Sequence, residues 1–90
     1  MTETVLRRRI VRALKTQWPL AWVWHPDSRF TSGIPDLLIC VEGNFLAIEV
    51  KTPRGRIAPI QHATLMKIRR AGGRAWIIRS VEELDDVFHA

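Results

Sequence analysis

Apolar side chains recur with the period of an α-helix near the start of the chain. Leu6, Ile10, Ala13 and Leu14 fall on one side of a helix that covers residues 3–17. The remaining sides of this segment are mostly polar or charged. The chain therefore begins with an amphipathic helix whose apolar side is expected to face a core.

Three short apolar stretches follow this helix and are separated by turn residues. They cover residues 21–25, 36–41 and 44–51, and each is rich in the aliphatic and aromatic residues typical of strands. The dipeptide Gly43-Asn44 is typical of a β-hairpin turn. We therefore predict three strands, of which the last two pair as an antiparallel hairpin.

The second half of the chain alternates helix and strand. Residues 59–71 have an apolar side at helical spacing, begin with a proline and stop at a Gly-Gly pair. Residues 74–79 form an apolar strand, and residues 80–88 open with a capping-box pattern and form a last short helix. A helical crossover makes the strands that it joins parallel. The predicted fold is one α/β domain over residues 1–90, with the order α-β-β-β-α-β-α and a mixed sheet flanked by helices.

Three charged side chains stand at the ends of two otherwise apolar strands. Glu49 and Lys51 are two residues apart in one strand, so they point to the same side of the sheet. If Gly43 and Asn44 form a two-residue loop, Asp36 lies opposite Lys51 and diagonal to Glu49, on that same side. The predicted hairpin therefore gathers two carboxylates and an ammonium at one point.

Two neighbouring carboxylates favour the binding of a cation. At about 4 Å they repel by about 1 kcal/mol in water and about 4 kcal/mol at an effective dielectric constant near 20. One lysine offsets only part of this repulsion, and a few oxygen ligands of this kind suit Mg²⁺ or Mn²⁺. The spacing leaves one alternative open, which is a surface salt-bridge cluster that adds little to stability.

The charge of the chain is positive and unevenly distributed. Its net charge is +5, with 14 Lys and Arg against 9 Asp and Glu. All the basic side chains lie in residues 1–79, whereas four of the acids lie in residues 80–90. A basic surface of this kind attracts a phosphate polyanion. We therefore expect nucleic acid as the partner, although a basic protein without that role could have the same composition.

The charged motifs resemble those of a known family of nucleases. Gly-Ile-Pro-Asp, ending at Asp36, and Glu-Val-Lys, at residues 49–51, resemble the signature of the PD-(D/E)xK nucleases. With Gln61 near the start of the next helix and Glu3 in the first helix, the order resembles the VRR-NUC family, the virus-type replication-repair nucleases. The resemblance covers nearly the whole chain. It implies a restriction-endonuclease-like core and metal-dependent hydrolysis of phosphodiester bonds in DNA.

The resemblance also implies roles for the residues of the hairpin. Asp36 and Glu49 would ligate Mg²⁺ or Mn²⁺, and the backbone carbonyl of Val50 would supply a further oxygen. Lys51 would orient or stabilise the attacking water and offset the charge that develops on the phosphorus centre.

Two residues outside the hairpin complete the implied site. Gln61 would position Lys51 or the water, although it also fits as an ordinary exposed helix residue. Glu3 lies on the core-facing side of the first helical turn and would bind a second metal ion or its water. A simpler reading of Glu3 is an acid that interacts favourably with the helix dipole.

Arginines outside the motifs are candidates for contacts with the DNA backbone. They lie on the polar sides of the first helix, in the polar segment before the hairpin, and in the loop after Lys51: Arg7, Arg8, Arg29, Arg54 and Arg56. Contacts of this type position DNA but do not specify its sequence.

The resemblance further implies a substrate and an assembly. A stand-alone unit of this family resembles dimeric nucleases that act on branched DNA such as Holliday junctions, so we expect a homodimer with a role in DNA repair. Trp18, Trp22 and Trp24 are candidates for the dimer interface, because aromatic residues are enriched at interfaces. Alternatively, these tryptophans fill the core.

The expected location is the cytoplasm of a prokaryotic cell or of a phage-infected host. Cys40 is the single cysteine, lies within a predicted strand and cannot form an internal disulfide. No apolar run is long enough to span a membrane, and charges interrupt the N-terminal segment where a secretory signal would need an apolar stretch.

Two other functions agree with parts of this pattern. A non-catalytic nucleic-acid-binding module could keep the nuclease fold and the basic charge, but it would bind DNA better without Asp36 and Glu49. A protein-interaction domain could carry the basic charge incidentally. Metal-dependent cleavage separates the nuclease from the first alternative, and a steep salt dependence of DNA binding separates it from the second.

Overall fold

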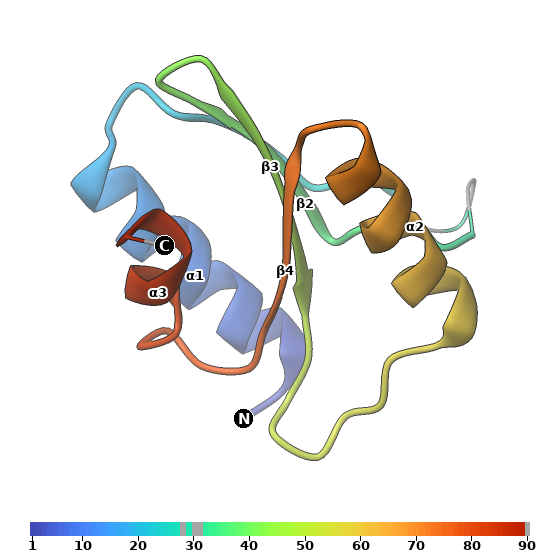
Figure 1. Cartoon of the computed structure of the whole chain (residues 1–90). Coiled ribbons are helices and arrows are strands. Elements are labelled where there is room, and N and C mark those ends of the chain that lie inside the picture. The colour runs from blue at the N-terminus through green and yellow to red at the C-terminus, as the bar shows by residue number, and fades with distance from the viewer. Residues whose placement is uncertain (28, 30–31, 90) are drawn as a thin grey trace.

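The computed structural model describes residues 1–27, 29 and 32–89, which form a four-stranded sheet with helices on both faces (Figure 1). The elements, in chain order, are α1 (Glu3–Gln17), β1 (Trp22–Trp24), β2 (Leu37–Val41), β3 (Asn44–Val50), α2 (Pro59–Arg70), β4 (Arg74–Ile78) and α3 (Leu84–His89). The predicted α/β fold and element order are therefore confirmed. Residues 28, 30 and 31 of the polar segment before the hairpin lie outside the described residues.

The first helix forms where the apolar period predicts it. The hydroxyl of Thr2 accepts a hydrogen bond from the Val5 N–H at 3.2 Å and caps the start of α1. Leu6, Ile10 and Leu14 are the buried residues of this helix. The helix therefore packs through the stripe that the sequence indicated and leaves its polar sides toward solvent.

The strands form one sheet in the order β1-β2-β3-β4. β2 pairs antiparallel with both β1 and β3, whereas β3 and β4 are parallel, as expected for strands joined by a helical crossover. In Figure 1, α1 and α3 cover one face of the sheet and α2 covers the other. Successive side chains of each strand therefore alternate between these two faces.

The hairpin between β2 and β3 turns one residue earlier than the sequence predicted. Val41 pairs with Asn44, so the two loop residues are Glu42 and Gly43, and the prediction of a Gly43-Asn44 loop was wrong. Both loop residues have positive φ, 50° and 79°, as in a type I′ turn, whose twist matches that of the flanking strands. The prediction failed because Gly43 can occupy either of the two loop positions.

This register changes the partner of Asp36 but not its side of the sheet. Leu37 pairs with Ile48, and extension of the ladder by one residue places Asp36 opposite Glu49 rather than opposite Lys51. The two registers differ by an even number of residues, so the alternation of faces is preserved. Asp36 and Glu49 consequently share the face that α2 covers.

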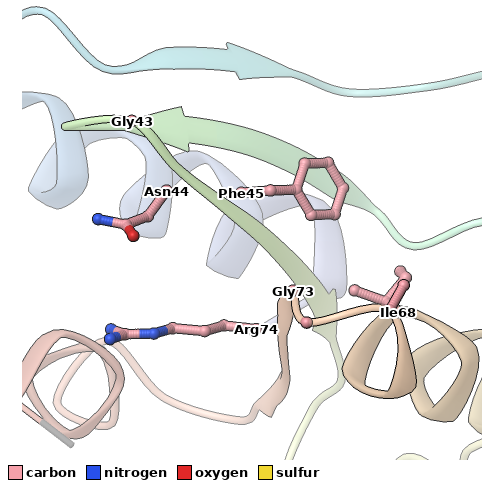
Figure 2. Close-up of a pocket in the computed structure, with 8 residues that line it drawn as sticks. Gly43, Asn44, Phe45, Ile68, Gly73 and Arg74 are labelled. Carbon is pink, nitrogen blue, oxygen red and sulfur yellow. The ribbon is translucent and has the colours of Figure 1, made fainter.

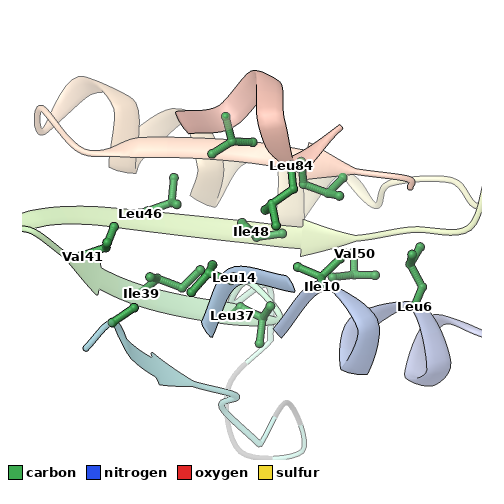
Figure 3. Packing of buried hydrophobic residues seen from close by; sticks show 13 residues of the cluster. Leu6, Ile10, Leu14, Leu37, Ile39, Val41, Leu46, Ile48, Val50 and Leu84 are labelled. Atoms are coloured by element: carbon green, nitrogen blue, oxygen red, sulfur yellow. The ribbon is translucent and has the colours of Figure 1, made fainter. Parts of the chain in front are cut away.

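Two hydrophobic clusters hold the sheet between its helices. The larger one joins the buried stripe of α1 to β2, β3, β4 and α3, and Figure 3 shows these side chains converging. The smaller one consists of Ala47, Leu65 and Ala75 and lies beneath α2. Among the described residues, no helix is both long and apolar enough to cross a membrane.

The tryptophans of β1 belong to neither cluster. Trp22 and Trp24 are 57% and 50% exposed, respectively, whereas Trp18 is partly buried against the larger cluster. The alternative that these tryptophans fill the core is therefore wrong for Trp22 and Trp24. Strand β1 is an edge strand of the sheet and pairs with β2.

Replacement of a buried and of an exposed leucine tests the larger cluster. Leu14 is 0% exposed and Leu20 is 99% exposed. We expect Leu14→Ala to lower the free energy of unfolding by about 2–5 kcal/mol, because it leaves a cavity. Leu20→Ala should change it by less than about 0.5 kcal/mol. Urea unfolding followed by circular dichroism measures both values, and equal effects of the two substitutions would contradict the described packing.

Candidate active site

Asp36 immediately precedes β2 and is held by a backbone N–H of β3 and by the side chain of His25. Its carboxylate Oδ2 accepts a hydrogen bond from the Val50 N–H at 2.8 Å. Its own backbone carbonyl accepts a hydrogen bond from Nδ1 of His25 at 2.7 Å, so that ring nitrogen carries the proton. These contacts fix the Asp36 carboxylate beside the end of β3.

The glycine of the Gly-Ile-Pro-Asp motif lets this segment approach α2 closely. Gly33 has a φ of +80°, and a Cβ at this position would lie 2.7 Å from Cγ1 of Ile60. A side chain would therefore strain the backbone and displace the first turn of α2. Gly33 thus sets the distance between the loop that leads to Asp36 and the helix that carries Gln61.

Glu49 lies near the end of β3 and is only 2% exposed. Its Oε1 accepts a hydrogen bond from Nε2 of Gln61 at 3.2 Å. Among the described side chains, Glu49 Oε2 is one of two buried polar atoms without a hydrogen-bond partner. A buried carboxylate oxygen without a partner is destabilising, which makes Oε2 a candidate ligand for a cation.

The first turn of α2 orients the amide of Gln61. Its Oε1 accepts a hydrogen bond from the N–H of Ala58, the residue that caps the helix, at 2.8 Å. Because the oxygen is used in this way, the amide nitrogen is turned toward Glu49. Gln61 therefore contacts a carboxylate, whereas the sequence suggested Lys51 or a water as its neighbour.

Lys51 follows β3 and lies beside Glu3 of α1. Its Nζ is 3.8 Å from Oε1 of Glu3, and its backbone N–H donates to the carbonyl of Ile78 at 3.1 Å. Both charges lie close enough to Glu49 to affect the ionisation of its carboxyl group. The structure thus brings together four of the predicted site residues, Asp36, Glu49, Lys51 and Glu3, with Gln61 on the α2 side.

Burial is the main cause that raises the pKa of Glu49 from 4.5 to about 8. A hydrogen bond with Asp36 and the negative charges of Asp36 and Glu3 act in the same direction, whereas Lys51 lowers this pKa. Near neutral pH the Glu49 carboxyl, which faces Asp36, therefore keeps its proton. A divalent cation bound between them would take the place of that proton.

The donor groups of this site fit a hard divalent cation that keeps water ligands. In the described ranges of the chain, no three or more His, Cys, Asp or Glu side chains are grouped so as to hold a metal ion. The site offers two carboxylates, one of which has a buried oxygen without a partner. Mg²⁺ is usually held by one or two carboxylates together with several waters, so Asp36 and Glu49 suit such an ion.

A basic groove lies on the other side of the segment that leads to Asp36. Arg7, Arg8 and Lys15 of α1 line this groove together with His25 and apolar residues of α1, β1 and β2, and its volume is about 290 Å³. His25 connects the groove to the site because its ring bonds to the carbonyl of Asp36. Two of the arginines predicted to contact DNA therefore lie in one groove.

The other three predicted DNA contacts lie in loops. Arg54 and Arg56 are exposed in the segment after Lys51. The guanidinium of Arg29 forms a bidentate pair with the carboxylate of Asp27, with the shortest distance at 2.7 Å. A phosphate would therefore compete with Asp27 for Arg29.

Arg79 is a positioning residue that the sequence did not single out. Its Nη1 donates to the backbone carbonyls of Thr52 at 2.9 Å and Gly55 at 2.6 Å. Arg79 directly follows β4, so it holds the loop after Lys51 against the end of the sheet. The available signal was a charged residue at the end of an otherwise apolar strand.

A hollow of about 410 Å³ lies at the opposite end of β3 from Glu49. Figure 2 shows the hairpin residues Asn44 and Phe45 beside it, together with Ile68, Gly73 and Arg74. The residues that line it include none of the predicted site residues. The carboxylate pair and this hollow are therefore separate features of the surface.

Comparisons with known proteins give a family and a fold. The family described as "VRR-NUC domain" matches residues 2–82 of this chain. A solved structure titled "VRR_NUC domain" superimposes with a TM-score of 0.74 and 22% sequence identity, and the match covers 99% of this chain and 97% of that chain. A search of curated proteins found no significant match. The resemblance inferred from the motifs is therefore confirmed.

The raised pKa of Glu49 predicts how stability depends on pH when divalent cations are absent. Between pH 4.5 and about 8, the unfolded chain releases a proton that the folded chain keeps. The free energy of unfolding therefore falls as pH rises through this window. Glu49→Gln removes the titrating group, so its Tm in EDTA should fall less toward alkaline pH than that of the parent. Each kcal/mol of difference corresponds to about 4–8 °C.

Thermal unfolding in EDTA, followed by circular dichroism from mildly acidic to mildly alkaline pH, measures this effect. Asp85→Asn changes an exposed acid of α3 and is the matched control. Its pH profile should follow that of the parent. Parallel profiles for Glu49→Gln and the parent would show that the pKa of Glu49 is not raised.

Proposed function

This chain belongs to the VRR-NUC family, and we propose that it is a Mg²⁺- or Mn²⁺-dependent endonuclease that hydrolyses phosphodiester bonds of DNA. The observation that carries the proposal is the juxtaposition of Asp36 and Glu49 at the ends of paired strands, with Lys51 close by. A buried carboxylate beside another acid does not stabilise a fold. Its presence is explained if the pair binds a cation that acts on phosphate.

Hydrogen bonds from neighbouring groups of the protein orient the proposed metal ligands. The Val50 N–H engages one oxygen of Asp36, and the Gln61 amide engages one oxygen of Glu49. Each carboxylate keeps its second oxygen for the ion, and the Val50 carbonyl is the further ligand expected from the family resemblance. A bound Mg²⁺ or Mn²⁺ would supply Lewis-acid polarisation of the phosphate and a more acidic water.

Lys51 is proposed to orient the attacking water and to offset the negative charge that develops in the transition state. Its side chain is largely buried and is paired with Glu3 at 3.8 Å, which restricts where the ammonium can lie. Glu3 is proposed to hold Lys51 in this position or to bind a second ion through a water. Gln61 is proposed to keep the Glu49 carboxylate turned toward the metal.

The DNA backbone is proposed to follow the basic groove and the loop after Lys51. Arg7 and Arg8 line the groove, and Arg54 and Arg56 are exposed on the loop. Arg29 is a further candidate contact once it is released from Asp27. These side chains would position DNA through phosphate contacts, which carry no sequence information.

A non-catalytic DNA-binding module is the second candidate function. The excess of positive charge supports it equally well. The carboxylate pair argues against it, because removing Asp36 and Glu49 would improve the attraction of DNA and the stability of the fold. A module of this kind would bind DNA without cleaving it in any divalent metal.

Substitution of the carboxylate pair and the lysine tests the catalytic proposal. We expect Asp36→Asn and Lys51→Ala each to reduce cleavage in Mg²⁺ by at least about 100-fold, because several kcal/mol of charge stabilisation in the transition state are lost. DNA binding in EDTA should be largely retained. Asp85→Asn and Lys67→Ala, which change exposed residues of the same types, are the controls. If Asp36→Asn or Lys51→Ala cleaves DNA at the parent rate, the assignment fails.

The homodimer and the preference for branched DNA stay predictions from the family resemblance. Two copies related by a two-fold axis would present two sites to two strands of a junction. Light scattering at micromolar concentration should give twice the mass of the 10.4 kDa chain. A panel of duplex, single-stranded, flap and four-way-junction DNA in Mg²⁺, Mn²⁺ and EDTA should show fastest cleavage of the branched forms. A monomeric mass, or equal rates on all forms, would contradict these predictions.

A further inference from the structure

Two exposed tryptophans lie on the sheet face that carries the carboxylate pair. The rings of Trp22 and Trp24 have their centroids 6.3 Å apart and are tilted by 42°. Both side chains are at least half exposed, as described above, although large aromatic side chains are usually buried. Neither tryptophan is needed to fill a core, so their position calls for a functional explanation.

The strand register places these rings close to the proposed metal site. Trp24 pairs with Leu38, which is two residues from Asp36 on the same face of β2. At a strand rise of about 3.4 Å per residue, this is a separation of about 7 Å along the strand. Trp22 pairs with Cys40 and lies one step farther away. The two rings therefore lie in a row along β2 on the face that carries the carboxylate pair, with Trp24 nearer to that pair.

The surface around the rings is open and apolar on one side of β1. α2 packs mainly against β4 and β3, and the two tryptophans of β1 stay at least half exposed on this face. Cys40 and Phe45 pair with each other in the same row as Trp22, and both are exposed. This face thus presents flat aromatic surface beside the acids.

The other side of β1 is strongly basic. Val23, between the two tryptophans, faces the groove that is lined by Arg7, Arg8, Lys15 and His25. The edge of the sheet therefore combines aromatic rings on one face with basic side chains on the other. Aromatic stacking platforms beside a positively charged groove are typical of proteins that bind single-stranded nucleic acid.

We propose that Trp22 and Trp24 stack on unpaired bases of the DNA substrate next to the phosphodiester bond that is cleaved. This inference rests on the proposed nuclease function and narrows its substrate to DNA with unpaired nucleotides near the cut. Bases within an intact duplex are stacked on one another and cannot reach these rings. A flap or a single strand supplies the free bases that the platform requires.

The charge of the region favours DNA over a second copy of this chain as the occupant. Two copies that paired edge to edge through β1 would bring Arg7, Arg8 and Lys15 close to their counterparts, and like charges oppose association. A polyanion neutralises the same side chains. We therefore assign Trp22 and Trp24 to substrate binding, and a two-fold interface would use another part of the surface.

The binding of two DNA probes to four variants tests the proposal. The probes are a fluorescein-labelled single strand of about 12 nucleotides and the duplex of the same sequence, and binding is measured by anisotropy in EDTA so that no cleavage occurs. We expect Trp22→Ala and Trp24→Ala each to weaken single-strand binding by about 5- to 100-fold and to leave duplex binding nearly unchanged. Trp24→Phe, which keeps an aromatic ring, should retain most of the affinity. Leu20→Ala, which removes an exposed apolar side chain just before β1, should have no effect.

Three results would overturn the proposal. They are unchanged single-strand affinity in both alanine variants, equal losses for single strand and duplex, and a parent dimer that becomes a monomer on Trp22→Ala. Because binding is measured without metal, these outcomes are independent of catalysis. Cleavage of the single strand by the parent protein in Mg²⁺, measured in parallel, reports separately on the proposed nuclease function.

Discussion

The burial of Glu49 beside the carboxyl of Asp36 is the constraint on which the rest of the structure depends. Burial and proximity raise the pKa of Glu49 to about 8, so the folded chain holds this group in an environment that disfavours its charged form. Nearby groups compensate part of this cost: the Val50 N–H bonds to Asp36, the Gln61 amide bonds to Glu49, and the Lys51 ammonium lowers the pKa of Glu49. A cation between the two acids would complete this set.

The two faces of the sheet carry different kinds of side chains. The face under α1 and α3 carries the larger apolar cluster, whereas the face under α2 has a small cluster and carries the acids at its end. The site draws on β2, β3, α1 and the first turn of α2, so it forms only when the layers are assembled. Arg79 strengthens this dependence because it joins the end of β4 to the loop after Lys51.

The fold places part of the positive charge of the chain along one edge of the sheet. α1 buries one stripe against the sheet and presents Arg7, Arg8 and Lys15 to a groove along β1. The same edge of the sheet carries Trp22 and Trp24 on its opposite face. Cationic side chains, aromatic rings and paired acids thus lie around a single sheet edge and the neighbouring strand ends, where we propose contacts with phosphates, bases and a metal ion.

The sequence by itself determined the elements, their order and the sides of the strands, because helical and strand periods depend on residues near one another in the chain. Asp36 and Glu49 were expected on one face, and an even offset in register left that expectation unchanged. Only the tertiary structure decided the register of the hairpin, because Gly43 fits either turn position. It also decided the raised pKa of Glu49, because burial of that carboxyl depends on what α2 covers. It also decided the exposure of Trp22 and Trp24. Burial is a relation between segments that are distant in the chain, and no local pattern encodes which part of a sheet a helix leaves open.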